Sequence, residues 1–190
     1  MKLDFSKIHT LSNYISFFRI LLAIPIFIFI SRIDEYEGAR NILLILYILA
    51  YISDIADGYI ARKLNQISEL GKIIDPLADK ALVFLVVTYL FYFELIPGYY
   101  YWIIIFRDII IFVGGVFVSK RIGKVLPSNY LGKLTVLFIG FYIIIVTMGV
   151  ESKNIFYQVL FYGSLLLSFA SVISYGLRGF KEIKEHNEVI

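Results

Sequence analysis

The chain has 190 residues, of which 59% are hydrophobic and 17% are charged, and its mean hydropathy is +0.81. So little polar surface cannot cover a water-soluble globule, and we expect a membrane protein. The chain contains no cysteine, which excludes a disulfide framework, an iron–sulfur cluster and a thiolate zinc site. The net charge is only +3, and Lys and Arg lie in short clusters at the ends of apolar runs, so no nucleic-acid partner is expected.

Six apolar stretches are long enough to cross the hydrocarbon core, which takes about 20 residues as a helix. They cover residues 15–33, 41–59, 73–93, 99–119, 131–149 and 155–176. The sequence therefore predicts an all-α fold, an integral membrane bundle of six transmembrane helices that forms a single domain over residues 1–190.

Two segments flank the predicted bundle. In residues 1–14 and the start of the first span, Ile8, Leu11, Ile15 and Phe18 recur at three- and four-residue spacing. This spacing favours an amphipathic helix on the membrane surface over a frayed tail. Residues 177–190 are expected to form a polar tail after the last span.

The basic residues predict the orientation. With six spans both termini share one side, and that side receives the loops at 60–72 and 120–133. The basic residues on this side are Lys2, Lys7, Arg62, Lys63, Lys72, Lys120, Arg121, Lys124, Lys133, Arg178, Lys181 and Lys184. The opposite side has Arg32, Arg40 and Lys153. By the positive-inside rule, the rich side is cytoplasmic.

Four aspartates lie within or beside the predicted spans, where an ionisable group costs roughly 2.5–3.5 kcal/mol and usually marks function. Asp54 and Asp57 are three residues apart, and Asp75 and Asp79 are four apart, so each pair shares one face of a helix. A purely structural role in hydrogen bonds or ion pairs between helices, with Lys72 and Lys80 neutralising part of the charge, is the alternative.

Carboxylates without histidine or cysteine nearby form an oxygen site suited to Mg²⁺, Mn²⁺ or Ca²⁺. Four of them suffice for two metal ions that hold a diphosphate. Beside them, Gly58, Ala61 and Gly71 would let a nucleotide approach the backbone, and Arg62 could pair with phosphate oxygens.

These residues form the pattern Asp54-x-x-Asp57-Gly58-x-x-Ala61-Arg62, eight residues, Gly71-x-x-x-Asp75-x-x-x-Asp79. The pattern resembles the signature of the CDP-alcohol phosphatidyltransferases at every fixed position. The resemblance implies a six-helix homodimer whose site opens to the cytoplasm. It also implies transfer of a phosphatidyl group from CDP-diacylglycerol to an alcohol, with release of CMP.

The resemblance also assigns roles by position. Asp54, Asp57 and Asp75 correspond to ligands of the metal, Mg²⁺ or Mn²⁺, that holds the CDP diphosphate. Asp79 corresponds to a ligand of a second ion and to the general base. Gly58, Ala61, Arg62 and Gly71 are then expected to bind the CDP-lipid.

The acceptor is less constrained. The run from Asp75 to Lys80, with Asn13, Arg19 and Pro25, looks most like the phosphatidylglycerophosphate synthases of the family, whose acceptor is glycerol 3-phosphate. Such an anionic acceptor needs cationic partners. The candidate acceptor-binding residues are Arg107, Arg121, Lys124 and Lys133.

Two ambiguities concern these cations. Arg107 could pair with Asp108 inside the span or face a phosphate, and the loop cations could serve topology alone. The segment from Gly132 to Thr135 resembles an element of the glycerophosphate enzymes but lacks its second Lys.

Other activities stay open at this point. The stretch from Arg107 to Gly115 also looks like the CDP-alcohol type of cardiolipin synthase, whose acceptor is phosphatidylglycerol. Inositol phosphate and serine are further possible acceptors. A cation carrier is the alternative from a different class, because intramembrane acids can line an ion path.

Overall fold

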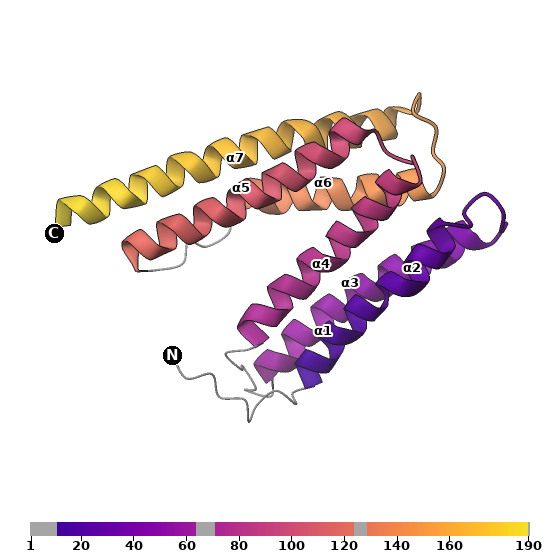
Figure 1. Cartoon of the computed structure of the whole chain (residues 1–190), viewed down its shortest axis with the longest axis horizontal. Coiled ribbons are helices and arrows are strands. Elements are labelled where there is room, and N and C mark those ends of the chain that lie inside the picture. Colours follow the sequence, from indigo (N-terminus) through magenta and orange to yellow (C-terminus); the bar gives the residue numbers. More distant parts are fainter. Residues whose placement is uncertain (1–10, 64–70, 124–128, 190) are drawn as a thin grey trace. The chain divides into compact units, whose positions relative to one another are not determined.

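A computed structural model gives the fold of the chain and describes residues 11–63, 71–123 and 129–189 (Figure 1). Within these ranges, the side chains of residues 11–14, 16, 57–63, 71–79 and 186–189 lie outside the description. The described residues form helices and turns, with no strand among them, which confirms the all-α prediction. The predicted surface helix at 1–14 lies outside the described residues, apart from the backbone of its last four.

The helices follow the predicted spans in order. They are α1 (Leu11–Leu21), α2 (Ala23–Ile30), α3 (Ala39–Lys63), α4 (Gly71–Tyr92), α5 (Gly98–Ile122), α6 (Tyr130–Thr147) and α7 (Ile155–Val189). Together α1 and α2 occupy most of the first predicted span, and each later helix covers most or all of one of the other five.

Four stretches of the described residues are long and apolar enough to cross a membrane. They are Ala39–Ala56, Gly98–Ile122, Tyr130–Thr147 and Ile155–Glu185. Their outer faces are apolar as well: on α5, Phe112 and Phe117 are 61% and 58% exposed, which suits contact with lipid. The chain is therefore a membrane protein. The first and third predicted spans correspond to shorter apolar stretches, Phe17–Ile30 and Lys80–Tyr92, and their crossing stays a prediction.

The first predicted span is divided at Leu22. The cause is Pro25, which has no N–H to donate to the carbonyl of Leu21 and whose ring crowds that carbonyl. The chain direction is nearly kept, because Leu22 N–H donates to the Phe18 carbonyl (3.0 Å) and Ile26 N–H to the Leu22 carbonyl (3.2 Å). Proline thus removes one helical hydrogen bond, and α2 continues in nearly the direction of α1.

The last helix is longer than its predicted span. It continues through the predicted polar tail as far as Val189. Beyond the apolar run, Lys181 and Glu185 form an i,i+4 ion pair with Nζ and Oε1 3.7 Å apart, a pairing that supports exposed helices. The prediction ended the span where apolar residues end, but the helix itself does not end there.

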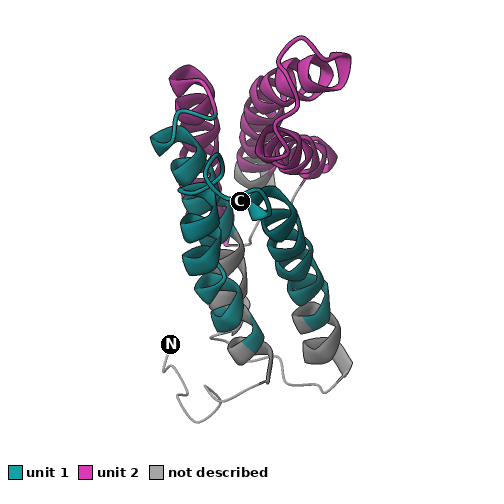
Figure 2. Cartoon of the chain, turned by 90° about the vertical axis from the view of Figure 1, so that its right-hand side faces the viewer, with its two compact units in different colours: residues 1–95 teal, residues 96–190 magenta. Residues whose placement is uncertain are grey.

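The helices group into two compact units, residues 1–95 and 96–190, which Figure 2 shows in different colours. In the first unit, α1 and α2 each pack against both α3 and α4. In the second, α7 packs against α5 and α6. The prediction of a single domain stays a prediction.

Small polar residues form the packed seam of the second unit. Ser164, Ser168 and Ser171 on α7 are at most 1% exposed. The Tyr100 hydroxyl lies 2.9 Å from Ser164 Oγ, and the Thr135 hydroxyl donates a hydrogen bond to the Leu167 carbonyl (3.1 Å). Small residues that also form hydrogen bonds across helices are typical of membrane helix packing.

Gly163 shows how closely α6 and α7 approach. A Cβ added at Gly163 would lie 2.8 Å from the Phe138 ring, whereas a Cβ at Gly140 on α6 would meet nothing within 4 Å. Gly163→Ala therefore overpacks this contact, and Gly140→Ala serves as a matched control with the same gain in helix propensity.

We expect Gly163→Ala to be less stable than Gly140→Ala by about 1–3 kcal/mol, because overpacked sites force neighbouring side chains out of their preferred rotamers. Chemical unfolding of the detergent-solubilised protein, followed by helical circular dichroism, measures the difference. Equal stability of the two variants would contradict the close contact between Gly163 and Phe138.

Candidate functional site

The four aspartates lie on two helices of the first unit. Asp54 and Asp57 are near the C-terminal end of α3, and Asp75 and Asp79 are in the first three turns of α4. The two helices follow one another in the chain, and α1 and α2 each pack against both of them.

Asp54 is the one member of the four whose side chain is described. Among the described side chains, no group of three potential metal ligands comes together. The side chains of Asp57, Asp75 and Asp79 are not among those described. The metal-binding roles of the four therefore stay predictions, as do the CDP-lipid-binding roles of Gly58, Ala61, Arg62 and Gly71, whose surroundings lie outside the description.

The Asp54 carboxylate forms an ion pair with Arg19, which lies in the last turn of α1. Arg19 Nη1 and Asp54 Oδ1 are 2.9 Å apart. The Arg19 side chain is 2% exposed and the Asp54 side chain 43% exposed, so a buried cation meets a carboxylate that is still accessible. The sequence contained one signal for this contact, a lone arginine inside an apolar span, since such a charge needs a partner.

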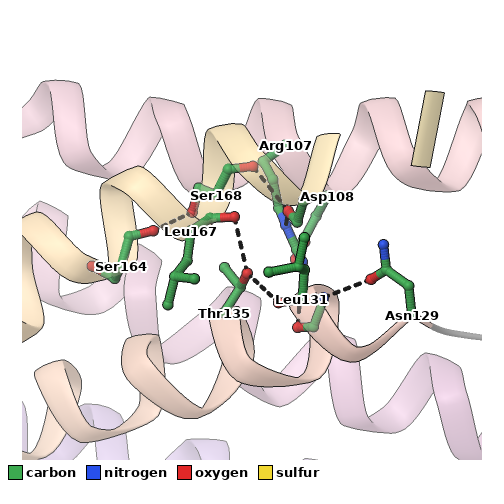
Figure 3. A network of polar contacts seen from close by, with 10 residues as sticks. Arg107, Asp108, Asn129, Leu131, Thr135, Ser164, Leu167 and Ser168 are labelled. Atoms are coloured by element: carbon green, nitrogen blue, oxygen red, sulfur yellow. Dashed lines mark hydrogen bonds and ion pairs between the residues drawn. The ribbon is translucent and has the colours of Figure 1, made fainter. Parts of the chain in front are cut away.

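Arg107 is buried and joins all three helices of the second unit. Its Nε donates to Ser171 Oγ on α7 (3.1 Å), its Nη2 to the Gly132 carbonyl on α6 (3.5 Å), and its Nη1 pairs with Asp108 beside it on α5. Figure 3 shows this network. Of the two alternatives for Arg107, the structure shows the internal ion pair.

The beginning of α6 is fixed in the same region. Asn129 caps the helix, because its Oδ1 accepts from the Gly132 N–H (2.6 Å), and its Nδ2 donates to Ser174 Oγ on α7 (3.0 Å). A Cβ at Gly132 would lie 2.8 Å from Asn129 Oδ1 and 3.4 Å from the Tyr175 ring. Glycine at this position therefore leaves room for the Asn129 cap.

The other candidate acceptor-binding residues are at the surface or undescribed. Arg121 is exposed, with its guanidinium carbon 5.9 Å from the centroid of the Phe117 ring. Lys133 is exposed on the first turn of α6, and Lys124 lies outside the described residues. Their roles in binding stay predictions.

An open hollow on the surface of α7 includes two of the cations that were assigned to the cytoplasmic side. It is lined by Ala170, Ile173, Ser174, Leu177, Arg178 and Lys181. Arg178 and Lys181 are one turn apart in this lining, and Lys181 also forms the ion pair with Glu185.

Known proteins are similar to this chain over the region that contains the aspartate motif. The family model described as CDP-alcohol phosphatidyltransferase matches residues 9–170, which include every position of the aspartate motif and run through both units. A CDP-diacylglycerol–glycerol-3-phosphate 3-phosphatidyltransferase of Aquifex aeolicus is 34% identical over 177 residues, 90% of this chain and 96% of the relative.

Two further relatives differ in how much of the chain they match. A protein of the same name from Rickettsia bellii is 33% identical over 190 residues, 98% of this chain and 99% of the relative. A cardiolipin synthase (CMP-forming) of Streptomyces coelicolor is 31% identical over 132 residues, 67% of this chain and 60% of the relative.

The contacts of Arg107 generate a prediction about stability. Arg107→Gln removes a buried charge and leaves its partners on three helices unpaired, so we expect a loss of about 2–3 kcal/mol of unfolding free energy. Lys133→Gln, at an exposed position, should change stability by less than about 0.5 kcal/mol. Denaturant unfolding in detergent measures both. Similar stability of Arg107→Gln and the unaltered protein would contradict the structural role of this network.

Proposed function

Because the chain belongs to the CDP-alcohol phosphatidyltransferases, we propose that it transfers a phosphatidyl group from CDP-diacylglycerol to glycerol 3-phosphate and releases CMP. The observation that carries this proposal is the complete aspartate motif on two successive helices, α3 and α4, that both pack against α1. The cation carrier considered from the sequence is not retained, since the family is one of transferases.

The acceptor is proposed from the extent of the similarity. The two relatives named for glycerol 3-phosphate match this chain over nearly their whole length, 96% and 99%. The cardiolipin synthase matches over 60% of its own length. Glycerol 3-phosphate is therefore the favoured acceptor, and phosphatidylglycerol the second candidate.

The donor set fits a hard divalent cation. Asp54 offers an accessible carboxylate, and the other motif acids are aspartates too, so every proposed ligand atom is an oxygen of the kind that Mg²⁺ and Mn²⁺ prefer. When bound, one or two such ions would neutralise the diphosphate of the CDP-lipid and make its lipid-linked phosphorus more electrophilic.

The chain's own residues then have defined tasks. Asp54, Asp57 and Asp75 would ligate the cation that binds the diphosphate of the CDP-lipid, and Arg62 would pair with phosphate oxygens. The small residues Gly58, Ala61 and Gly71 leave room for the nucleotide.

The reaction is a phosphoryl transfer between two oxygens. Asp79 accepts the proton of the acceptor hydroxyl while that oxygen attacks the lipid-linked phosphorus. The bond from this phosphorus to the bridging oxygen breaks, and CMP leaves with that oxygen. Positioning of the two substrates supplies most of the rate enhancement expected for such a transfer.

The topology belongs to the same proposal. We propose six spans, with both termini and the aspartates on the cytoplasmic side, because that side carries most of the Lys and Arg residues. A homodimer is proposed from the resemblance to the family.

The first prediction from this proposal concerns the acceptor. Purified protein with Mg²⁺ and CDP-diacylglycerol should release CMP fastest with glycerol 3-phosphate, compared with phosphatidylglycerol, inositol phosphate and serine. Arg121→Gln or Lys133→Gln should raise the KM for glycerol 3-phosphate more than that for CDP-diacylglycerol, because a dianion depends on nearby cations. Lys153→Gln, in the loop between α6 and α7, is the matched control. A preference for phosphatidylglycerol would reassign the enzyme as a cardiolipin synthase.

The second prediction separates binding from chemistry. Asp79→Asn should slow single-turnover CMP release by about 10²–10⁴-fold while CDP-diacylglycerol still binds, since general-base catalysis contributes that much. Asp57→Asn should weaken metal-dependent CDP-diacylglycerol binding as well. If Asp79→Asn loses affinity as severely as Asp57→Asn, or keeps a near-normal rate, Asp79 is not the base.

A further inference from the structure

Arg19 stands in contact with the first aspartate of the motif and has no role in the reaction proposed above. Its guanidinium is 2% exposed and reaches Asp54 Oδ1 at 2.9 Å. An arginine stays protonated at any pH that the protein experiences, so this contact places a permanent positive charge beside a proposed metal ligand. The two residues come from different helices, α1 and α3, which pack against each other.

The Asp54 carboxylate can still bind another partner while it contacts Arg19. Each carboxylate has two oxygens that can accept about four bonds in all, and the ion pair uses Oδ1. Because 43% of the Asp54 side chain is exposed, the group keeps room for a second partner on its open side. Arg19 can therefore hold Asp54 in one rotamer while that aspartate also ligates a cation.

The charge of Arg19 acts in two opposite directions. Without metal, the carboxylates of the proposed site would repel one another, and a fixed cation would offset part of that repulsion. With metal, the same cation repels the incoming ion, since like charges several ångströms apart near a protein surface still interact strongly. Hydrogen bonding and charge are separable here, because Lys keeps the charge of Arg but not its planar fork.

We propose that Arg19 is a positioning residue of the metal site, which orients Asp54 and serves as its internal counter-charge while the divalent cation is absent. This inference rests on the metal site of the proposed function. The charge of Arg19 makes metal binding weaker than four carboxylates alone would give. The same charge keeps the site folded when no metal is bound.

The test measures metal binding directly. Mn²⁺ is titrated into detergent-solubilised protein, and the free ion is followed by its electron paramagnetic resonance signal. Arg19→Met and Arg19→Gln should bind Mn²⁺ at least about tenfold more tightly than the unaltered protein, because the opposing charge is gone. Arg19→Lys should stay within about threefold in affinity yet release CMP more slowly, since Asp54 loses its orientation.

Thermal unfolding gives an independent readout. In excess chelator, Arg19→Met should have a lower unfolding temperature than the unaltered protein. Added Mn²⁺ should raise the unfolding temperature of Arg19→Met by more than it raises that of the unaltered protein. The double variant Arg19→Met with Asp54→Asn should recover part of the stability in chelator, because it removes the uncompensated carboxylate as well. Arg40→Met is the matched control, since it breaks the exposed pair with Asp34 (3.3 Å) in the same unit and should leave Mn²⁺ affinity unchanged.

The outcomes separate this inference from the proposed function. Unchanged or weaker Mn²⁺ binding in Arg19→Met and Arg19→Gln, with an equal loss of stability with and without Mn²⁺, would show a purely structural ion pair and overturn the role of Arg19 alone. If the unaltered protein does not bind Mn²⁺ at all, both the metal site and the role of Arg19 are wrong.

Discussion

A charge placed among apolar helices must find a partner within the protein, and this constraint organises both units. Arg19 and Arg107 are at most 8% exposed, and each is paired with an aspartate. The Arg19 pair joins α1 to α3, while Arg107 also reaches α6 and α7 through Gly132 and Ser171. In each unit, a buried guanidinium therefore links helices that pack against one another.

The two arginines nevertheless have different surroundings. Arg107 contacts Ser171, Gly132 and Asp108, which lie outside the aspartate motif, and it links the three helices of its unit. Arg19 pairs with the first aspartate of the motif. The same chemical solution therefore serves packing in one unit and the proposed site in the other.

The helices could be predicted from the sequence because a membrane helix satisfies its own backbone, and apolar runs therefore mark its position. Two details could not be predicted from apolar content. Apolar content does not register the helical bond that Pro25 removes between α1 and α2. The last apolar run also ends before Lys181 and Glu185, whose ion pair supports a further part of α7. Hydropathy indicates the surrounding solvent, whereas helix ends depend on local backbone bonds.

The candidate site was predictable as far as it is local. Asp54 and Asp57, like Asp75 and Asp79, share a helical face by spacing alone. The partner of Asp54 was not predictable, because Arg19 comes from another helix and only the packing of α1 against α3 brings the two together. For Arg107, the pair with its neighbour Asp108 was among the alternatives, but the contacts with Gly132 and Ser171 depend on the same kind of long-range packing.

The length of α7 sets a limit on how this protein can sit in a bilayer. Its 35 residues extend about 52 Å, while the hydrocarbon core is about 30 Å thick. Even at a tilt of about 40°, the upper end of what membrane helices adopt, only about 26 residues fit inside. The remaining turns must stand in the headgroup region or beyond it, and the charged stretch that begins at Arg178 is the part of α7 suited to that depth. When α7 spans a bilayer, the thickness of the hydrocarbon core therefore sets how much of that charged stretch meets water.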